Sequence, residues 1–284
     1  AIIGPIIPPS NIMIIYAGCV GTVSVGKMFL AGAIPGILLG IAYMIFCYWI
    51  SVKRKYPCRK TRATWKEIGH ATWETLPALL LPIIIMGTIT LGICTATESS
   101  AIAVIYSTIV AACKKNLSIK SFCRACIRSA KAAANVLFII AISSAMAWAV
   151  TTLGVAQALT NFCVAYINNK IVFLLFVNVL LLLIGMLLDA SPALLLMVPI
   201  LWPVAKTLGI DAIHFGVMVC FNLMVGTLTP PVGMMLFIVS NVGKVKLSVM
   251  YKGILPFVAV AVVVLLLITY VPSLTTWLPG VLMP

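Results

Sequence analysis

Charged side chains are scarce in this 284-residue sequence: they occupy 8% of positions, only 5 residues are acidic, and 63% are hydrophobic. A soluble domain carries about 25% charged residues. With a third of that share, the chain cannot cover a globule of this size with solvated groups, so a soluble enzyme is excluded. A disordered chain is excluded as well, because disorder combines low hydrophobicity with high charge.

Motifs of catalysis and metal binding are also lacking. The sequence has no Walker loop, no HExxH, no GxSxG and no paired carboxylates, so the chain cannot itself use ATP. Its 9 cysteines are scattered, which argues against a disulfide framework. Cys123 and Cys126 form a single CxxC without a second pair to complete a zinc site. His70 and His214 have no partner in helical register. We therefore expect no enzyme activity, no cofactor and no metal other than a transported ion.

Long apolar runs dominate instead, and the mean hydropathy is +1.21. The clearest run, Met28 to Val52, would be about 36 Å long as a helix, which crosses a bilayer with some tilt. Because the runs are continuous rather than alternating, they predict an all-α polytopic membrane protein. The further apolar runs cover 76–91, 101–113, 132–153, 171–188, 194–208, 213–239 and 254–271.

Basic residues set the expected topology. The formal net charge is +14, and all Lys and Arg except Lys27, Lys170 and Lys206 lie in the segments 53–66, 114–131 and 244–252. Such clusters mark cytoplasmic loops rather than a nucleic-acid surface. The chain must then cross an even number of times between successive clusters.

Between the second and third clusters this rule predicts a re-entrant hairpin. The runs 171–188 and 194–208 must enter and leave by the same face, with Asp189-Ala190-Ser191-Pro192 as the tip. The amphipathic stretches Trp65–Thr75 and Leu117–Ala130 are too polar to span and are expected along the cytoplasmic interface, where they anchor the chain to the lipid bilayer. Specific lipid binding there is the alternative.

A short repeat points to a site. Residues 4–13 (GPIIPPSNIM) and 226–235 (GTLTPPVGMM) share a glycine, a proline pair and a methionine at matching positions. In the expected topology they lie in oppositely directed helices, which is typical of an inverted-topology repeat. Two adjacent prolines break a helix, so carbonyl oxygens are freed at bilayer depth, where only a buried or cavity-lining break is tolerated. The alternative is a proline kink that serves packing.

The freed carbonyls at Gly226, Thr227, Leu228 and Thr229, with the two threonine hydroxyls, are hard oxygen ligands suited to Na⁺. Asp189, among leucines, is costly in a bilayer. It either binds an ion or caps the helix that follows. Capping is the simpler interpretation for Asp211 before Ala212, while Glu98 either caps a helix or handles an ion or proton.

At these residues the sequence resembles the large membrane subunit of TRAP transporters, the tripartite ATP-independent periplasmic carriers, and in particular its C-terminal portion. The stretches that carry the resemblance are GPIIPPSNIMIIYAG (4–18), FLAGAIPGILLG (29–40), GICTATESSAIAVIYS (92–107), the block from GMLLDASPALLL to GTLTPPVGMMLF (185–237) and LPFVAVAVVVLLLITYVPSLTTWLP (255–279).

The resemblance implies an inverted-repeat, elevator-type secondary transporter with a re-entrant hairpin and broken helices, its first repeat incomplete here. It implies Na⁺ as the coupling ion, held at two sites. One site would use Asp189, Ala190, Ser191, Gly226, Thr227 and Thr229. The other would use Gly4, Pro5, Pro8 and Ser10, with a hairpin that precedes residue 1. The substrate contacts carried over are Pro9, Asn11, Pro230, Pro231 and Val232.

The implied partners are a small four-helix membrane subunit, a periplasmic substrate-binding protein and a small organic acid, either a sialic or sugar acid or a C4-dicarboxylate. The implied location is the bacterial inner membrane. The competing hypotheses are a truncated remnant with a scaffolding or assembly role, an ion channel and an intramembrane enzyme.

The expected segments are 1–52 (end of the first repeat), 53–75 (basic loop and interfacial helix), 76–170 (scaffold helices and arm), 171–241 (hairpin and broken helix) and 242–284 (loop and last span).

Overall fold

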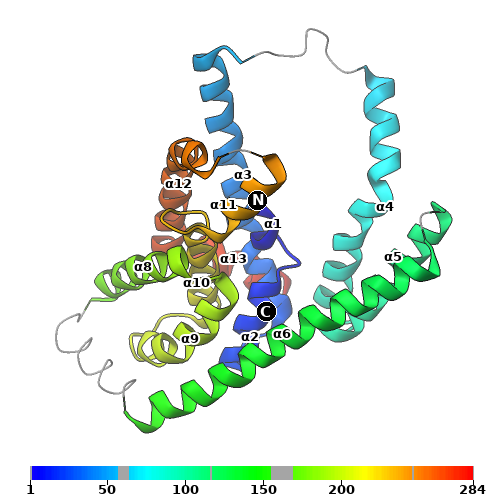
Figure 1. Ribbon diagram of the computed structural model, residues 1–284. Helices are drawn as coiled ribbons and strands as arrows, with labels where there is room; N and C mark the ends of the chain where they lie inside the picture. Colours follow the sequence, from blue (N-terminus) through cyan, green and yellow to red (C-terminus); the bar gives the residue numbers. More distant parts are fainter. Residues whose placement is uncertain (1, 57–63, 116, 155–168, 245, 284) are drawn as a thin grey trace. The chain divides into compact units, whose positions relative to one another are not determined.

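In a computed structural model, the described residues are 2–56, 64–115, 117–154, 169–244 and 246–283, and the regular structure in them is entirely helical (Figure 1). Within these ranges, 8 stretches are long and apolar enough to cross a membrane. The predicted all-α polytopic class is therefore confirmed. Arg59, Lys60 and Arg62 of the first basic cluster lie outside the described residues.

The chain separates into two compact units, one formed by Ala1–Phe46 with Leu137–Pro284, the other by Cys47–Val136.

The smaller unit is built on a hairpin of α4 (Trp65–Thr90) and α5 (Ala96–Cys113). The hydroxyl of Tyr106 donates to the Pro77 carbonyl at 2.8 Å, which ties the two helices together. The stretch Trp65–Thr75, expected as a separate interfacial helix, is instead the first part of α4. Thr64 begins this helix with a capping box, and no proline occurs before Pro77.

The same correction applies to α6 (Ile119–Thr152), which runs without interruption through the stretch expected to end at Ala130. Its sequence contains neither glycine nor proline and is rich in alanine, so nothing stops the helix where its composition changes from polar to apolar. The boundaries that polarity alone predicted, at Thr75 and Ala130, are therefore wrong.

The larger unit begins with a broken helix, α1 (Ile3–Ile6) and α2 (Asn11–Val20), followed by α3 (Val25–Arg54). Small residues let α3 approach the broken helix α1–α2 closely. A Cβ added at Gly36 would lie 2.6 Å from Cγ1 of Ile7, and one added at Gly32 would lie 2.9 Å from the Met13 sulfur. This spacing of small residues is typical of close helix pairs in membranes.

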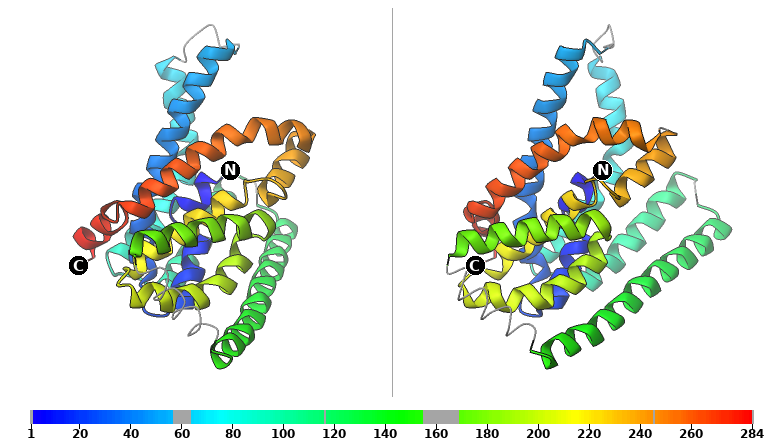
Figure 2. Two further views of the ribbon diagram at one scale, coloured as in Figure 1. Left: turned by 90° about the vertical axis from the view of Figure 1, so that its left-hand side faces the viewer. Right: turned by 60° about the vertical axis from the view of Figure 1, so that its left-hand side comes forward.

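The hairpin predicted between 171 and 208 is present. It consists of α8 (Lys170–Leu187) and α9 (Ala190–Thr207), which lie side by side and are joined at Leu188 and Asp189 (Figure 2). The predicted tip, Asp189 to Pro192, overlaps the observed turn only at Asp189, because Ala190, Ser191 and Pro192 already belong to α9. The chain continues through α10 (Ala212–Gly226), α11 (Met234–Gly243), α12 (Leu247–Tyr270) and α13 (Ser273–Leu282). The sequence analysis missed α13 and placed the start of α12 at Ile254.

Helix α10 forms the core of the larger unit. Every residue from His214 to Gly226 is buried, and α10 contacts α1, α2, α8, α9, α12 and α13. A helix that is apolar on all sides is stable only when it is surrounded in this way. It meets α8 at two glycines, where a Cβ added at Gly185 would lie 3.0 Å from the Gly226 Cα.

A chain of buried polar side chains joins α10 to its neighbours. The Asn222 amide donates to Asn178 Oδ1 at 2.7 Å, and the Asn178 amide donates to Thr269 Oγ1 at 3.0 Å. The ring nitrogens of His214 lie 2.9 Å from Thr275 Oγ1 and 3.2 Å from the Thr269 carbonyl oxygen. The partners of His214 therefore come from α12 and α13, and not from its own helical register.

Substituting Gly185→Ala is expected to destabilise the protein by about 1–3 kcal/mol, because the new methyl group meets backbone that cannot rotate away. Gly253→Ala on α12 is the matched control, since a Cβ there meets no atom within 4 Å. Thermal or denaturant unfolding in detergent measures both. Equal melting temperatures for the two variants would show that the α8–α10 contact is loose.

The asparagine pair predicts non-additive effects. Asn178→Leu alone is expected to cost about 1–2 kcal/mol, because one N–H of the buried Asn222 amide and the acceptor on Thr269 Oγ1 lose their partner, while Asn222 keeps its bond to the Asn178 backbone carbonyl. Asn178→Leu with Asn222→Leu should cost less than the sum of the single changes, since both partners of one bond are then removed. A double-mutant cycle on unfolding free energies checks this, and strict additivity would contradict it.

Candidate functional site

The second broken helix opens where the sequence predicted. Helix α10 ends at Gly226, α11 begins at Met234, and the Pro230–Pro231 peptide bond is cis. Thr227 and Thr229 are buried. Their hydroxyls donate to the carbonyls of Met224 and Val225, each at 2.8 Å, so their oxygen lone pairs remain available to a ligand.

The expectation of four freed carbonyls is wrong for two of them. The Gly226 oxygen accepts from the Thr229 N–H at 2.9 Å, and the Thr227 oxygen accepts from the Met235 N–H at 3.2 Å. The segment folds back on itself after the break, with Gly233 in the left-handed region at φ 59°. Within the described ranges, the carbonyl oxygens of Leu228 and Thr229 have no hydrogen-bond donor.

The first break repeats this arrangement. Helix α1 ends at Ile6, α2 begins at Asn11, and Pro8–Pro9 is cis. Ser10 is buried, and its hydroxyl donates to the Pro5 carbonyl. Gly4 and Pro9 are exposed, as is Asn11, while Pro5 is half-buried and Pro8 is buried.

The two breaks belong to oppositely directed helices. Tyr16, in the second half of α2, donates its hydroxyl to the Ala212 carbonyl at 2.8 Å, and its ring lies against Gly216. The end of the first broken helix therefore meets the start of α10, while α1 also contacts α10. An antiparallel pair with matching breaks is the geometry of an inverted repeat.

The hairpin tip lies beside the second break. The Gly233 N–H donates to the Met186 carbonyl at 3.3 Å, three residues before Asp189. Asp189 is exposed, and its side chain makes no capping hydrogen bond although it occupies the N-cap of α9. Asp189 thus stands at the N-cap position that the capping alternative requires, but its side chain does not make the capping bond. Ala190 is buried and Ser191 is half-buried. The structure thus bonds the end of α8, three residues before the predicted cluster Asp189 to Ser191, to the segment 226–233.

One residue near the break was not predicted. The Tyr251 hydroxyl on α12 donates to the Pro231 carbonyl at 2.9 Å and so fixes the linker between α10 and α11. The predicted substrate contacts Pro230 and Val232 beside it are half-buried, and Pro231 is exposed. Nothing in the local sequence marks Tyr251, because its partner is 20 positions away.

The two other acidic residues singled out cap helices. Asp211 Oδ1 accepts from the N–H groups of Ile213 and His214, both at 2.9 Å. Glu98 closes a capping box on α5, where its carboxylate accepts from the Thr95 N–H at 2.7 Å and the Thr95 hydroxyl at 2.8 Å. Capping is therefore the role of Glu98 that the structure supports.

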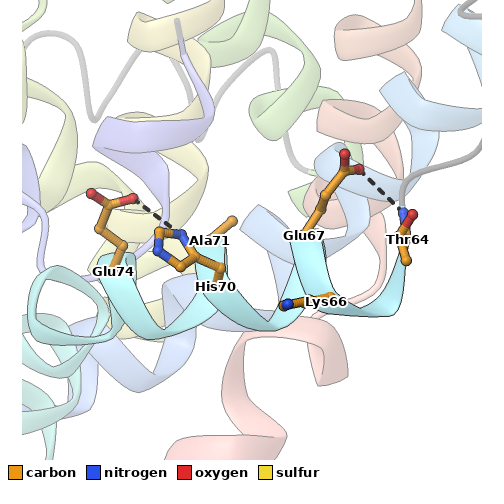
Figure 3. A pocket seen from close by; sticks show the side chains of 6 residues that line it. All are labelled: Thr64, Lys66, Glu67, His70, Ala71 and Glu74. Carbon is orange, nitrogen blue, oxygen red and sulfur yellow. Dashed lines mark hydrogen bonds and ion pairs between the residues drawn. The ribbon is translucent and has the colours of Figure 1, made fainter.

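His70 lies on a depression of about 550 Å³ over the start of α4 (Figure 3). Its Nδ1 is 3.9 Å from the Glu74 carboxylate, and both side chains are exposed. The lining residues come from one helix and its cap, so this is an open helix face rather than an enclosed site. No group of three or more potential metal ligands among His, Cys, Asp and Glu occurs within the described ranges, and Cys123 and Cys126 are exposed on α6.

Helix ends give the breaks a defined polarity. Helices α1 and α10 end at the breaks, so their partly negative C-termini face them, while α2 and α11 begin there without a side-chain cap. Carbonyl ends attract a cation, and free N–H groups attract an anion. The buried hydroxyls of Thr227 and Thr229 lie at the second break.

These features define a class of protein: an all-α polytopic membrane protein with paired, antiparallel broken helices and a helical hairpin at one break. Residues 1–274 match the profile of the family described as tripartite ATP-independent periplasmic transporter, DctM component. The chain belongs to this family.

Three relatives illustrate its range. A sialic acid TRAP transporter permease protein, SiaT, of Haemophilus influenzae is 38% identical over 100% of this chain and 46% of its own length. The C4-dicarboxylate TRAP transporter large permease protein DctM of Pseudomonas aeruginosa is 35% identical over 98% of this chain and 65% of its own. The uncharacterised protein YgiK of Salmonella typhimurium is 38% identical over 99% and 65%. The chain thus spans less than two thirds of these relatives, and those with an assigned activity are permeases.

The capping role of Glu98 predicts tolerance of its neutral amide. Glu98→Gln should leave the melting temperature and any transport unchanged, because glutamine also completes a capping box. Glu98→Ala should lower the melting temperature by removing the bond to the Thr95 N–H. A transport defect in Glu98→Gln at unchanged stability would restore the ion-handling interpretation.

Proposed function

We propose that the chain carries ion and substrate sites of a Na⁺-coupled secondary transporter that imports an organic acid across the bacterial inner membrane. The carrying observation is the second break, where α10 ends, the Thr227 and Thr229 hydroxyls are buried, and Met186, three residues before Asp189, accepts from the Gly233 N–H. Oxygen-only ligands of this kind suit Na⁺, and a single carboxylate supplies the opposite charge.

The proposed Na⁺ ligands at this break are Asp189, Ala190, Ser191, Gly226, Thr227 and Thr229. The carbonyls of Leu228 and Thr229 are added as candidates, because they have no donor within the described ranges. Gly4, Pro5, Pro8 and Ser10 would contribute to a second ion site at the first break. The uncapped starts of α2 and α11 attract an anionic group, so the adjacent residues 9, 11 and 230–232 are the proposed substrate contacts.

The proposed substrate class is a sialic or sugar acid or a C4-dicarboxylate, supported by the names of the relatives. The family description of a tripartite periplasmic transporter supports two partners, a small membrane subunit and a periplasmic substrate-binding protein. Both ion and substrate would move by an elevator-type displacement of the unit that holds α1, α2 and α8 to α11.

The test is uptake of a labelled acid into vesicles that contain the complete transporter. Uptake is expected to need an inward Na⁺ gradient, because filling the carbonyl-lined breaks with a cation is part of substrate binding. Labelled sialic acid and succinate are compared in sodium and in choline buffer. Equal uptake in choline would overturn Na⁺ coupling, and a failure to accumulate substrate uphill would favour a channel.

Asp189→Asn is expected to raise the Na⁺ concentration for half-maximal uptake about tenfold, since a charge-assisted contact is worth about 1.5–3 kcal/mol. Asp211→Asn is the matched control, because asparagine caps a helix as well as aspartate does. Melting temperatures show that both variants fold. An unchanged Na⁺ titration in Asp189→Asn would remove Asp189 from the site.

A further inference from the structure

A separate hollow of the larger unit lies between α3 and α12, away from the breaks. It measures about 390 Å³, within the range of about 300–1,000 Å³ that small-molecule sites occupy. All its lining side chains are apolar; they include Ala42 and Phe46 of α3 and Pro256, Ala259 and Val263 of α12. Such a groove suits a hydrocarbon chain and offers nothing to the polar groups of an organic acid.

Aromatic contacts fix the two walls. The Phe257 ring of α12 meets the Phe46 ring edge-on, with centroids 5.1 Å apart and planes at 90°, and the Tyr43 ring at 5.8 Å. These rings hold α3 and α12 together beside the hollow. The groove is therefore shaped by this chain alone.

A basic residue continues the groove. Lys252 precedes Pro256, Ala259 and Val263 by 4, 7 and 11 positions, which places all four on one face of α12. From Lys252 to Val263 the helix rises about 16 Å. One leaflet of the hydrocarbon core is about 15 Å deep. The line of residues therefore extends from a headgroup position to the middle of a bilayer.

The charge around Lys252 is of one sign. Lys244 and Lys246 precede it in the same basic segment, and the sequence contains no acidic residue after Asp211. Lys252 is exposed, and no salt bridge to it occurs within the described ranges. Basic groups at this depth attract anionic headgroups.

We propose that the α3–α12 groove binds one acyl chain of an anionic phospholipid of the cytoplasmic leaflet, with the lipid phosphate at Lys252. Charge decides between lipid and protein as the occupant. The apolar lining leads along α12 to the exposed Lys252, and an apolar chain that ends in an anionic group is the structure of a phospholipid. The groove shares no residue with the proposed ion site, although Lys252 directly follows Tyr251, which bonds the Pro231 carbonyl at the second break.

Native mass spectrometry of the purified protein in micelles with equal amounts of phosphatidylglycerol and phosphatidylcholine tests this proposal. Both lipids carry the same acyl chains. The wild type is expected to retain phosphatidylglycerol preferentially. Lys252→Gln should reduce that preference about fivefold, the effect of one basic residue near a membrane surface. Ala259→Trp should abolish the retained lipid by filling the groove.

Two controls match these changes. Lys206→Gln removes a charge from α9, and Leu255→Trp adds the same ring to an exposed position of α12 outside the groove. Both should keep the wild-type lipid. Three results would each overturn the proposal. Lys252→Gln could keep the wild-type preference for phosphatidylglycerol, Ala259→Trp could still retain the lipid, or the two control variants could lose as much lipid as the test variants. The measurement reads bound lipid rather than transport, so its outcome does not depend on Na⁺ coupling.

Discussion

Backbone polar groups must be satisfied wherever a chain leaves helical geometry inside an apolar environment, and this constraint shapes the larger unit. At the second break the required bonds come from three directions: Met235 N–H to Thr227, Gly233 N–H to Met186, and the Tyr251 hydroxyl to Pro231. They leave only a few oxygens free. The break is thus a folded structure with a small number of open acceptors, and the proposed cation site depends on these few oxygens.

Local chemistry explains what was predictable. Proline pairs broke both helices at the expected residues, the Asp189 tip joined α8 to α9, and Asp211 capped α10. Each of these depends on residues a few positions apart, so the sequence contains the full cause. The same holds for the polytopic class, which follows from composition and run length.

Contacts over long sequence separations explain what was missed. The partners of His214 lie 55 and 61 positions away, and Tyr251 reaches a carbonyl 20 positions earlier. The free carbonyls at 226–229 were overcounted because Met235 returns to Thr227 only through the fold. Helix α6 continued across a change in polarity because no residue in it stops a helix. Both ion sites, the one at Asp189 and the second break as well as the one at Gly4, Pro5, Pro8 and Ser10, and the coupling ion itself stay predictions.

The glycine pair has a mechanical consequence. At Gly185 and Gly226 two backbones touch without any side chain between them, so no rotamer change can absorb a shift of α8 against α10. Tyr16 fastens the first broken helix to the opposite end of α10 in a similar way. In the proposed transport cycle the hairpin and both broken helices would therefore move as a single block, and a probe fixed to any one of them would report the displacement of all three.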